Sequence, residues 1–212
     1  MPVRLEGKLP ADAYLAVNLL RNGKLSVHIS ELATGDSLVS ALKEKVQSKT
    51  ATDIFHHTFD YVESPDYRKL LQEALDKGLE VFKDTENQNN WENIWGIDAG
   101  ANLAYLLGAN STTVGCAIGQ CTKETTAPNT GRTSNATPTG KAVLFCELSP
   151  PAEKEKAPFD EEYYNGLISR TAKLADMTEE DLKAPSNGDT AAAAFPTILT
   201  AGLVAILASV AA

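Results

Sequence analysis

Three cysteines are the residues of this sequence with the widest choice of chemistry: Cys116, Cys121 and Cys146. Cysteine can bind a metal, act as a nucleophile or form a disulfide. The four residues between Cys116 and Cys121 do not match the CxxC spacing of zinc sites. Because the last histidine is His57, a zinc site built from these cysteines has no evident fourth ligand. We therefore expect no metal site and no cofactor. In a secreted protein, an odd number of cysteines leaves one without an intrachain partner.

Two short segments contain the residue types of a serine hydrolase. Residues 35–38 read GDSL, the nucleophile motif of GDSL hydrolases, and residues 53–56 read DIFH, which offers an acid and a base. In such enzymes the acid and histidine come from the far end of a long domain, whereas these motifs are adjacent and no oxyanion-hole segment follows. We favour Asp36 and Ser37 as helix-cap residues and predict no enzymatic activity. A hydrolase using Ser37 and His56 remains the alternative.

The three histidines do not form an expected metal site. His28 stands alone, while His56 and His57 are neighbours. Adjacent residues of an extended segment point to opposite faces, so His56 and His57 do not easily bind the same ion. We interpret them as a strand-edge or surface pair.

Charge is distributed unevenly along the 212 residues. The chain has 19 Lys and Arg against 28 Asp and Glu, a net charge of −9, and every charged residue lies at or before Asp189. No window holds the cluster of basic residues that a polyanion needs, so nucleic acid is excluded as a partner. The last 23 residues, 190–212, carry no charge.

The carboxyl-terminal segment has the pattern of a glycosylphosphatidylinositol (GPI) anchor signal. Small residues at a cleavage position, a short spacer and a hydrophobic end make this signal, and Ser186, Asn187 and Gly188 are the candidate attachment residues. We expect an ectodomain over residues 1–183, a linker with the attachment site over 184–189, and the GPI signal over 190–212. A tail anchor inserted from the cytosol and a buried helix are the alternatives.

The amino-terminal residues conflict with entry into the secretory pathway. Residues 1–8 read MPVRLEGK and lack the apolar run of a signal peptide. Either the true start is missing, or the carboxyl-terminal segment is a tail anchor. A missing amino-terminal stretch that carries another cysteine would also resolve the odd cysteine count. We therefore expect the amino terminus to be incomplete.

The remaining sequence predicts alternating helices and strands. Periodicity and start signals predict helices over residues 11–20, 37–46 and 160–174, the last capped by Asp160, and a further helix within residues 91–107. A further amphipathic helix is predicted to begin with Ser64 as its cap and Pro65 at its first position. Strands are predicted over residues 58–62, 112–121 and 141–148. The apolar strands 112–121 and 141–148 are expected at the centre of a sheet, joined by an exposed Thr-rich loop over 122–140. The fold class is α/β, a three-layer α-β-α sandwich with a small antiparallel sheet.

Several of these segments resemble one known group of proteins. Residues 114–121 (VGCAIGQC) and 143–151 (VLFCELSPP) resemble the carboxyl-terminal strand pair of the CAP superfamily of cysteine-rich secretory, antigen 5 and pathogenesis-related proteins. The chain is closer still to the GPI-anchored surface antigens of Eimeria and related coccidian parasites, through residues 91–95 (WENIW), 145–150 and 158–167 (PFDEEYYNGL). The resemblance covers residues 58–212, and residues 1–50 match poorly.

The resemblance implies a CAP-like fold, a disulfide between Cys116 and Cys146, and an upstream cysteine partner for Cys121. A hairpin brings facing residues close enough for the first pairing. Many CAP proteins hold a divalent metal with two histidines and two acids, but residues 100–107 (GANLAYLL) lack the corresponding histidine. The resemblance thus implies a non-enzymatic antigen at the outer leaflet of the plasma membrane. Its expected partners are a host cell-surface receptor or antibody, and the lipid of its anchor.

Two N-glycosylation sequons begin at Asn110 and Asn135. Asn135 lies in the Thr-rich segment and is expected to be accessible, whereas Asn110 immediately precedes a predicted central strand. We therefore expect Asn135 to be the better acceptor.

Overall fold

The computed structural model describes residues 3–5, 9–88, 90–126 and 133–183. The described elements, in chain order, are β1 Val3–Leu5, α1 Ala11–Asn22, β2 Ala33–Thr34, α2 Asp36–Gln47, β3 Phe55–Asp60, α3 Tyr67–Lys83, α4 Trp91–Gly96, α5 Asp98–Leu106, β4 Thr113–Thr126, β5 Thr133–Ser149, α6 Glu161–Ser169, and the 3-10 turns η1 Leu174–Asp176 and η2 Glu179–Leu182.

The sheet is built around the β4–β5 hairpin. Its strand order is β1-β4-β5-β3, with the short β2 paired in parallel to β4, so β3 forms one edge. The β4–β5 register places Cys116 opposite Cys146, and the β3–β5 register places Phe55 on the other side of Cys146. Both central strands lie where the apolar sequence predicted them.

Helices cover both faces of this sheet, as an α/β sandwich requires. The larger core contains the apolar faces of α1, α3, α5 and α6 together with alternate residues of β4, including Val114 and Ile118. The intervening Ala117 faces the other way, into a smaller core with Leu42 and Val46 of α2. The predicted α/β sandwich is therefore confirmed, and the absence of strict polar alternation in β4 follows from burial on both faces.

Two glycines allow helices to lie close to a neighbouring strand or helix. A Cβ on Gly115 of β4 would lie 2.7 Å from the backbone nitrogen of Val39, so the first turn of α2 rests directly on the strand. A Cβ on Gly78 of α3 would lie 2.4 Å from the Cβ of Leu103 in α5. Any larger side chain at either position would push a helix away from its neighbour.

The bounds of several elements differ from the sequence prediction. The helix after Pro65 is capped by Asp66 and not by Ser64. The Asp66 carboxylate accepts a hydrogen bond from the Lys69 backbone N–H at 3.1 Å. The segment 91–107, predicted to contain a helix, contains two, because the extended backbone of Ile97 separates α4 from α5. The strand predicted over 58–62 begins earlier, at Phe55, because its alternation continues through both histidines.

The last predicted helix begins at its predicted cap but ends earlier than predicted. Asp160 is the predicted cap, and its carboxylate accepts the Tyr163 amide at 2.8 Å. The helix nevertheless ends at Ser169, and Leu174 packs from the separate turn η1. Apolar spacing alone did not distinguish one helix from a helix followed by a turn.

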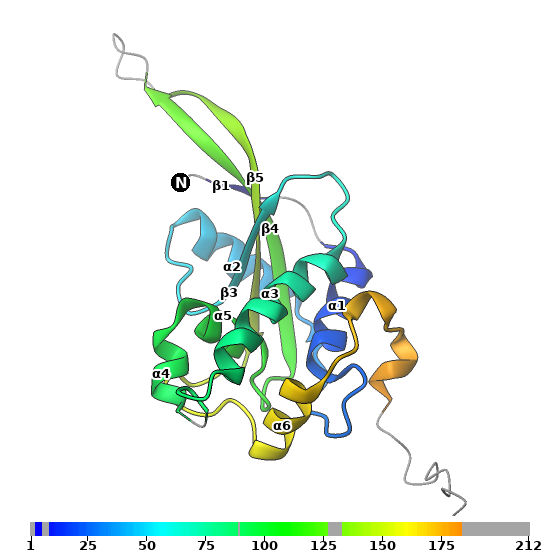
Figure 1. Ribbon diagram of the computed structural model, residues 1–212. Helices are drawn as coiled ribbons and strands as arrows, with labels where there is room; N and C mark the ends of the chain where they lie inside the picture. Colours follow the sequence, from blue (N-terminus) through cyan, green and yellow to red (C-terminus); the bar gives the residue numbers. More distant parts are fainter. Residues whose placement is uncertain (1–2, 6–8, 89, 127–132, 184–212) are drawn as a thin grey trace, which may run out of the picture.

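The described residues of the Thr-rich segment, 122–126 and 133–140, form a β-ribbon, which corrects the predicted loop for them. Backbone pairing continues from Thr122 opposite Pro138 to Thr126 opposite Thr133, with two register irregularities. The ribbon runs beyond the helices at its far end (Figure 1). We expected a loop because this segment has too few apolar residues to bury much surface. The strand pairing of the central hairpin nevertheless continues outward through backbone hydrogen bonds.

Candidate functional site

A disulfide lies at the centre of the sheet. Cys116 and Cys146 are bonded across the β4–β5 hairpin with a Cα–Cα distance of 4.1 Å, and both side chains are buried. The pairing implied by the family resemblance is therefore present. The bond closes a loop spanning 30 residues. It joins the two strands that carry the projecting ribbon, and so fixes the base of the ribbon to the core.

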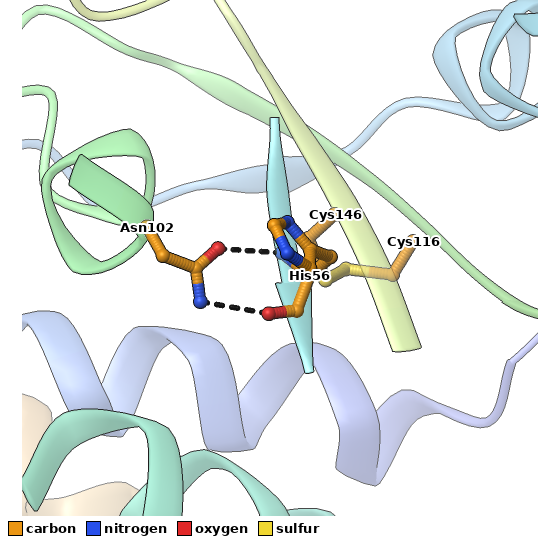
Figure 2. Close-up of a disulfide and its surroundings, with 4 residues drawn as sticks. All are labelled: His56, Asn102, Cys116 and Cys146. Carbon is orange, nitrogen blue, oxygen red and sulfur yellow. Dashed lines mark hydrogen bonds between the residues drawn. A yellow bond between two sulfur atoms is a disulfide. The ribbon is translucent and has the colours of Figure 1, made fainter. Parts of the chain in front are cut away.

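Next to the disulfide, Asn102 of α5 takes the place of a neighbouring strand at the sheet edge. Its Oδ1 accepts the backbone N–H of His56 at 2.8 Å, and its Nδ2 donates to the His56 carbonyl oxygen at 2.7 Å. Figure 2 shows the Asn102 amide facing the His56 backbone, beside the disulfide. The side-chain amide thus reproduces the donor and acceptor of a peptide group. No sequence pattern pointed to Asn102, which lies in the segment 100–107 that lacks the histidine of many CAP proteins.

The two adjacent histidines face opposite sides of β3, as predicted. Burial alternates along the strand, so His56 is exposed and His57 is buried. The His57 Nε2 lies 3.3 Å from a carboxylate oxygen of Glu73 on α3. Burial nevertheless lowers the pKa of His57, against the raising effect of the Glu73 carboxylate. His57 is thus predominantly neutral at neutral pH and serves the packing of α3 on β3.

A small polar pocket of about 210 Å³ lies between α2, the residues before β3 and the end of β5. One of its walls holds Lys45, whose Nζ lies 2.5 Å from Oε1 of Glu147. Another holds Asp53, which accepts a hydrogen bond from the Tyr105 hydroxyl at 3.0 Å and pairs with Lys154.

The ion pairs of this pocket determine its electrostatics. The hydrogen bond from Lys154 lowers the pKa of Asp53, and burial, with Asp53 beside it, raises the pKa of Tyr105. Each carboxylate is matched by a lysine, so the pocket presents a neutral pair of salt bridges. A general base or nucleophile needs a pKa close to neutral pH. The shifts of Asp53 and Tyr105 move the pKa of each residue further from neutral pH.

The structure places the two hydrolase motifs on different elements, the first at the start of α2 and the second at the start of β3. Ser37 lies in the first turn of α2, and the ring Nδ1 of His56 lies 3.4 Å from the carbonyl oxygen of Ile54. The predicted cap role for Asp36 or Ser37 is wrong by one residue, because Gly35 is the N-cap and no side chain caps α2. In the part of the chain that the structure describes, no cluster of three or more His, Cys, Asp or Glu residues forms a metal site.

Cys121 is a free thiol, buried on β4. The register places it opposite Val3 of β1, the other edge strand. An upstream cysteine partner for Cys121 stays a prediction.

The two N-glycosylation sequons lie in different kinds of structure, one in a turn and one in a strand. Asn110 is exposed in the turn between α5 and β4, followed by Ser111, whose hydroxyl donates to the Pro150 carbonyl oxygen at 2.7 Å. Asn110 is therefore accessible although it precedes a central strand, and the expected preference for Asn135 stays a prediction. Asn135 lies within β5, on the outer part of the ribbon.

The attachment candidates Ser186, Asn187 and Gly188, with the segment 190–212, lie outside the described residues. Within the described residues, no helix combines the length and hydrophobicity needed to span a membrane.

Comparison with known proteins adds a structural relationship. No family model matches the sequence, and a search of curated proteins found no match. The solved structure of the Eimeria tenella surface antigen protein SAG19 aligns with 79% of this chain and 97% of that chain, at 20% identity and a TM-score of 0.50. The two proteins share a fold. The hookworm platelet inhibitor aligns with 74% of this chain and 80% of that chain, at 14% identity and a TM-score of 0.48.

Proposed function

We propose that this chain is the ectodomain and anchor signal of a GPI-anchored parasite surface antigen, with a display and binding role and no catalytic activity. The observation that carries the proposal is the fold shared with SAG19 over 97% of that chain. Its partners are a host cell-surface receptor or antibody.

Two further features support this proposal. The Cys116–Cys146 disulfide suits an oxidising compartment, which is where GPI attachment occurs. The uncharged segment 190–212 follows the small residues Ser186, Asn187 and Gly188, in the order of an anchor signal. The β4–β5 ribbon extends beyond the helices and would present its outer strand residues to other molecules (Figure 1).

Release by phosphatidylinositol-specific phospholipase C tests the anchor. The full chain is expressed in eukaryotic cells behind a supplied signal peptide and an amino-terminal epitope. The proposal expects the epitope at the cell surface and its release by the enzyme. A matched variant in which Ser186, Asn187 and Gly188 are all replaced by Gln should not be released, because attachment requires small residues.

Two outcomes favour the alternatives instead. A chain that stays in the membrane after phospholipase treatment and keeps a carboxyl-terminal epitope is a tail-anchored protein. Ester hydrolysis by the purified chain that disappears in Ser37→Ala would establish a hydrolase and contradict the non-catalytic role.

A further inference from the structure

A hollow of about 310 Å³ lies at the surface between the first residue of α4 and the start of α6; we call it the α4–α6 hollow. Its lining residues are Trp91, Ala157, Phe159, Asp160, Glu161 and Tyr164. Ala157, Asp160 and Glu161 are exposed, and Trp91 is half-buried. The hollow is therefore open to solvent, and it can contact one group of a ligand without enclosing a whole molecule.

Aromatic rings form the apolar part of this lining. The Trp91 ring is nearly perpendicular to the ring of Phe159, at 85° and a centroid distance of 5.2 Å, and to that of Tyr164, at 79° and 6.2 Å. The Tyr164 hydroxyl donates a hydrogen bond to the Phe82 carbonyl oxygen. Phe159 and Tyr164 are almost fully buried, so Trp91 offers most of the accessible aromatic surface. The electron-rich face of an indole attracts cations more strongly than the rings of Tyr or Phe do.

The charges of the α4–α6 hollow also favour a cation. Asp160 and Glu161 are its charged lining residues, and neither forms a salt bridge with a lysine, arginine or histidine in the part of the chain that the structure describes. Lys156, the basic residue nearest in sequence, pairs with Glu153 at 2.5 Å. The amino-terminal end of α6 contributes about half a positive charge. The carboxylates of Asp160, Glu161 and Glu162 outweigh that charge.

A guanidinium group matches both parts of this lining. It is planar and weakly hydrated, so it stacks on an aromatic face while its N–H groups donate to carboxylate oxygens. Asp160 Oδ1 accepts the Tyr163 N–H, which leaves Oδ2 and the exposed Glu161 carboxylate as acceptors for a ligand. A quaternary ammonium has no N–H to donate, and the ammonium of lysine is more strongly hydrated and has no flat face. The lining thus favours arginine among the cations.

We propose that the α4–α6 hollow binds an arginine side chain of a partner protein, whose guanidinium stacks on Trp91 and donates to Asp160 and Glu161. A protein partner is favoured because the open hollow covers only the end of a side chain, so the rest of the contact must come from surface around it. Tryptophan and arginine are also the residue types that carry much of the binding energy at protein interfaces. The proposal goes beyond surface display and does not depend on the anchor.

NMR titration of the isotope-labelled full chain tests this proposal. The Kd of each probe is taken from the shifts of the backbone amide resonances at the start of α6. The first probe is N-acetyl-argininamide, and its uncharged counterpart is N-acetyl-citrullinamide, in which a urea replaces the guanidinium. The citrulline probe should have a Kd about tenfold higher, because the cation–π contact and the ion pairs are both lost. N-acetyl-lysinamide should bind about threefold more weakly than the arginine probe.

Two further probes test the source and the class of the cation. The lining holds no basic residue that could pair with the carboxylate of free arginine, so free arginine should bind no more tightly than N-acetyl-argininamide. Tetramethylammonium should bind more weakly than the arginine probe, because it cannot donate to the carboxylates. Tighter binding of free arginine would overturn the assignment to a protein side chain. Tighter binding of tetramethylammonium would overturn the assignment to a guanidinium.

Substitutions locate the site on the chain. Glu161→Gln should raise the Kd of the arginine probe about threefold. The matched control is Glu162→Gln, an exposed neighbour in the same first turn of α6 that does not line the hollow, and it should leave the Kd unchanged. Trp91→Leu should raise the Kd about fivefold by removing the aromatic face. If Trp91→Leu does not fold, Glu161→Lys at its exposed position should raise the Kd about tenfold.

Three results overturn the proposal as a whole. The first is the absence of any shift at the start of α6 when the arginine probe is added. The second is an equal Kd for the arginine and citrulline probes. The third is an equal effect of Glu161→Gln and Glu162→Gln on the arginine probe.

Discussion

Removing the central disulfide gives the sharpest test of how the sheet is stabilised. The perturbation is the double replacement Cys116→Ala with Cys146→Ala, which avoids leaving free thiols. The bond closes a loop spanning 30 residues, and the chain-entropy model assigns to a loop of this length about 3.6 kcal/mol of stabilisation at 25 °C. Such a loss is a large share of the total stability of a domain, which is about 5–15 kcal/mol. The melting temperature should fall by about 7–14 °C.

Urea unfolding followed by circular dichroism measures this effect. The double variant should have a free energy of unfolding lower by about 3–4 kcal/mol. The control is Cys121→Ala, which truncates a buried thiol without opening a loop and should cost about 1 kcal/mol through the small cavity it leaves. A double variant that loses less than the Cys121→Ala control would refute the reasoning that the bond stabilises the fold by constraining the unfolded chain.

Three further predictions follow from the neighbourhood of β3 and from the surface. Asn102→Leu should lower the free energy of unfolding by about 1–3 kcal/mol and speed hydrogen exchange of the His56 amide, because two hydrogen bonds are lost; unchanged exchange would contradict the strand-like role of the amide. Burial lowers the pKa of His57 in the folded state, so the unfolded state takes up the proton first, and stability should fall as pH drops below 6.5 until the folded pKa is passed. His57→Gln should remove that dependence and the exposed His56→Gln should keep it, as measured by urea unfolding across pH 5–8. Expression in glycosylating cells should give a chain whose electrophoretic mobility shifts on glycosidase treatment, and Asn110→Gln should remove that shift in whole or, if Asn135 is also occupied, in part; a shift that is unaffected by Asn110→Gln would contradict accessibility of this turn.

The parts of the fold that could be predicted are those in which local pattern and burial agree. The central strands were found because Val114 and Ile118 belong to short apolar runs rich in β-branched residues, which are typical of a strand covered on both faces. The amphipathic face of α3 was found because its apolar residues recur at helical spacing. The cap Asp160 was found because its carboxylate bonds locally, within three residues.

The missed features depend on contacts between distant residues. Asn102 bonds to His56, 46 positions earlier, and no local pattern of α5 marks an asparagine as the cap of a sheet edge. The outer ribbon continues the strand pairing of the disulfide-linked hairpin, and the local pattern of the Thr-rich segment does not mark that continuation. The break at Ile97 is likewise hidden, since apolar residues continue through it at helical spacing.

The carboxyl terminus of the mature protein tests the central claim most directly. The full chain, purified from the surface of cells in which it was expressed behind a signal peptide, is digested and its last peptide identified by mass spectrometry. The account predicts a peptide that ends at Ser186, Asn187 or Gly188 and carries a glycolipid remnant. A last peptide that ends at Ala212 would contradict GPI anchoring.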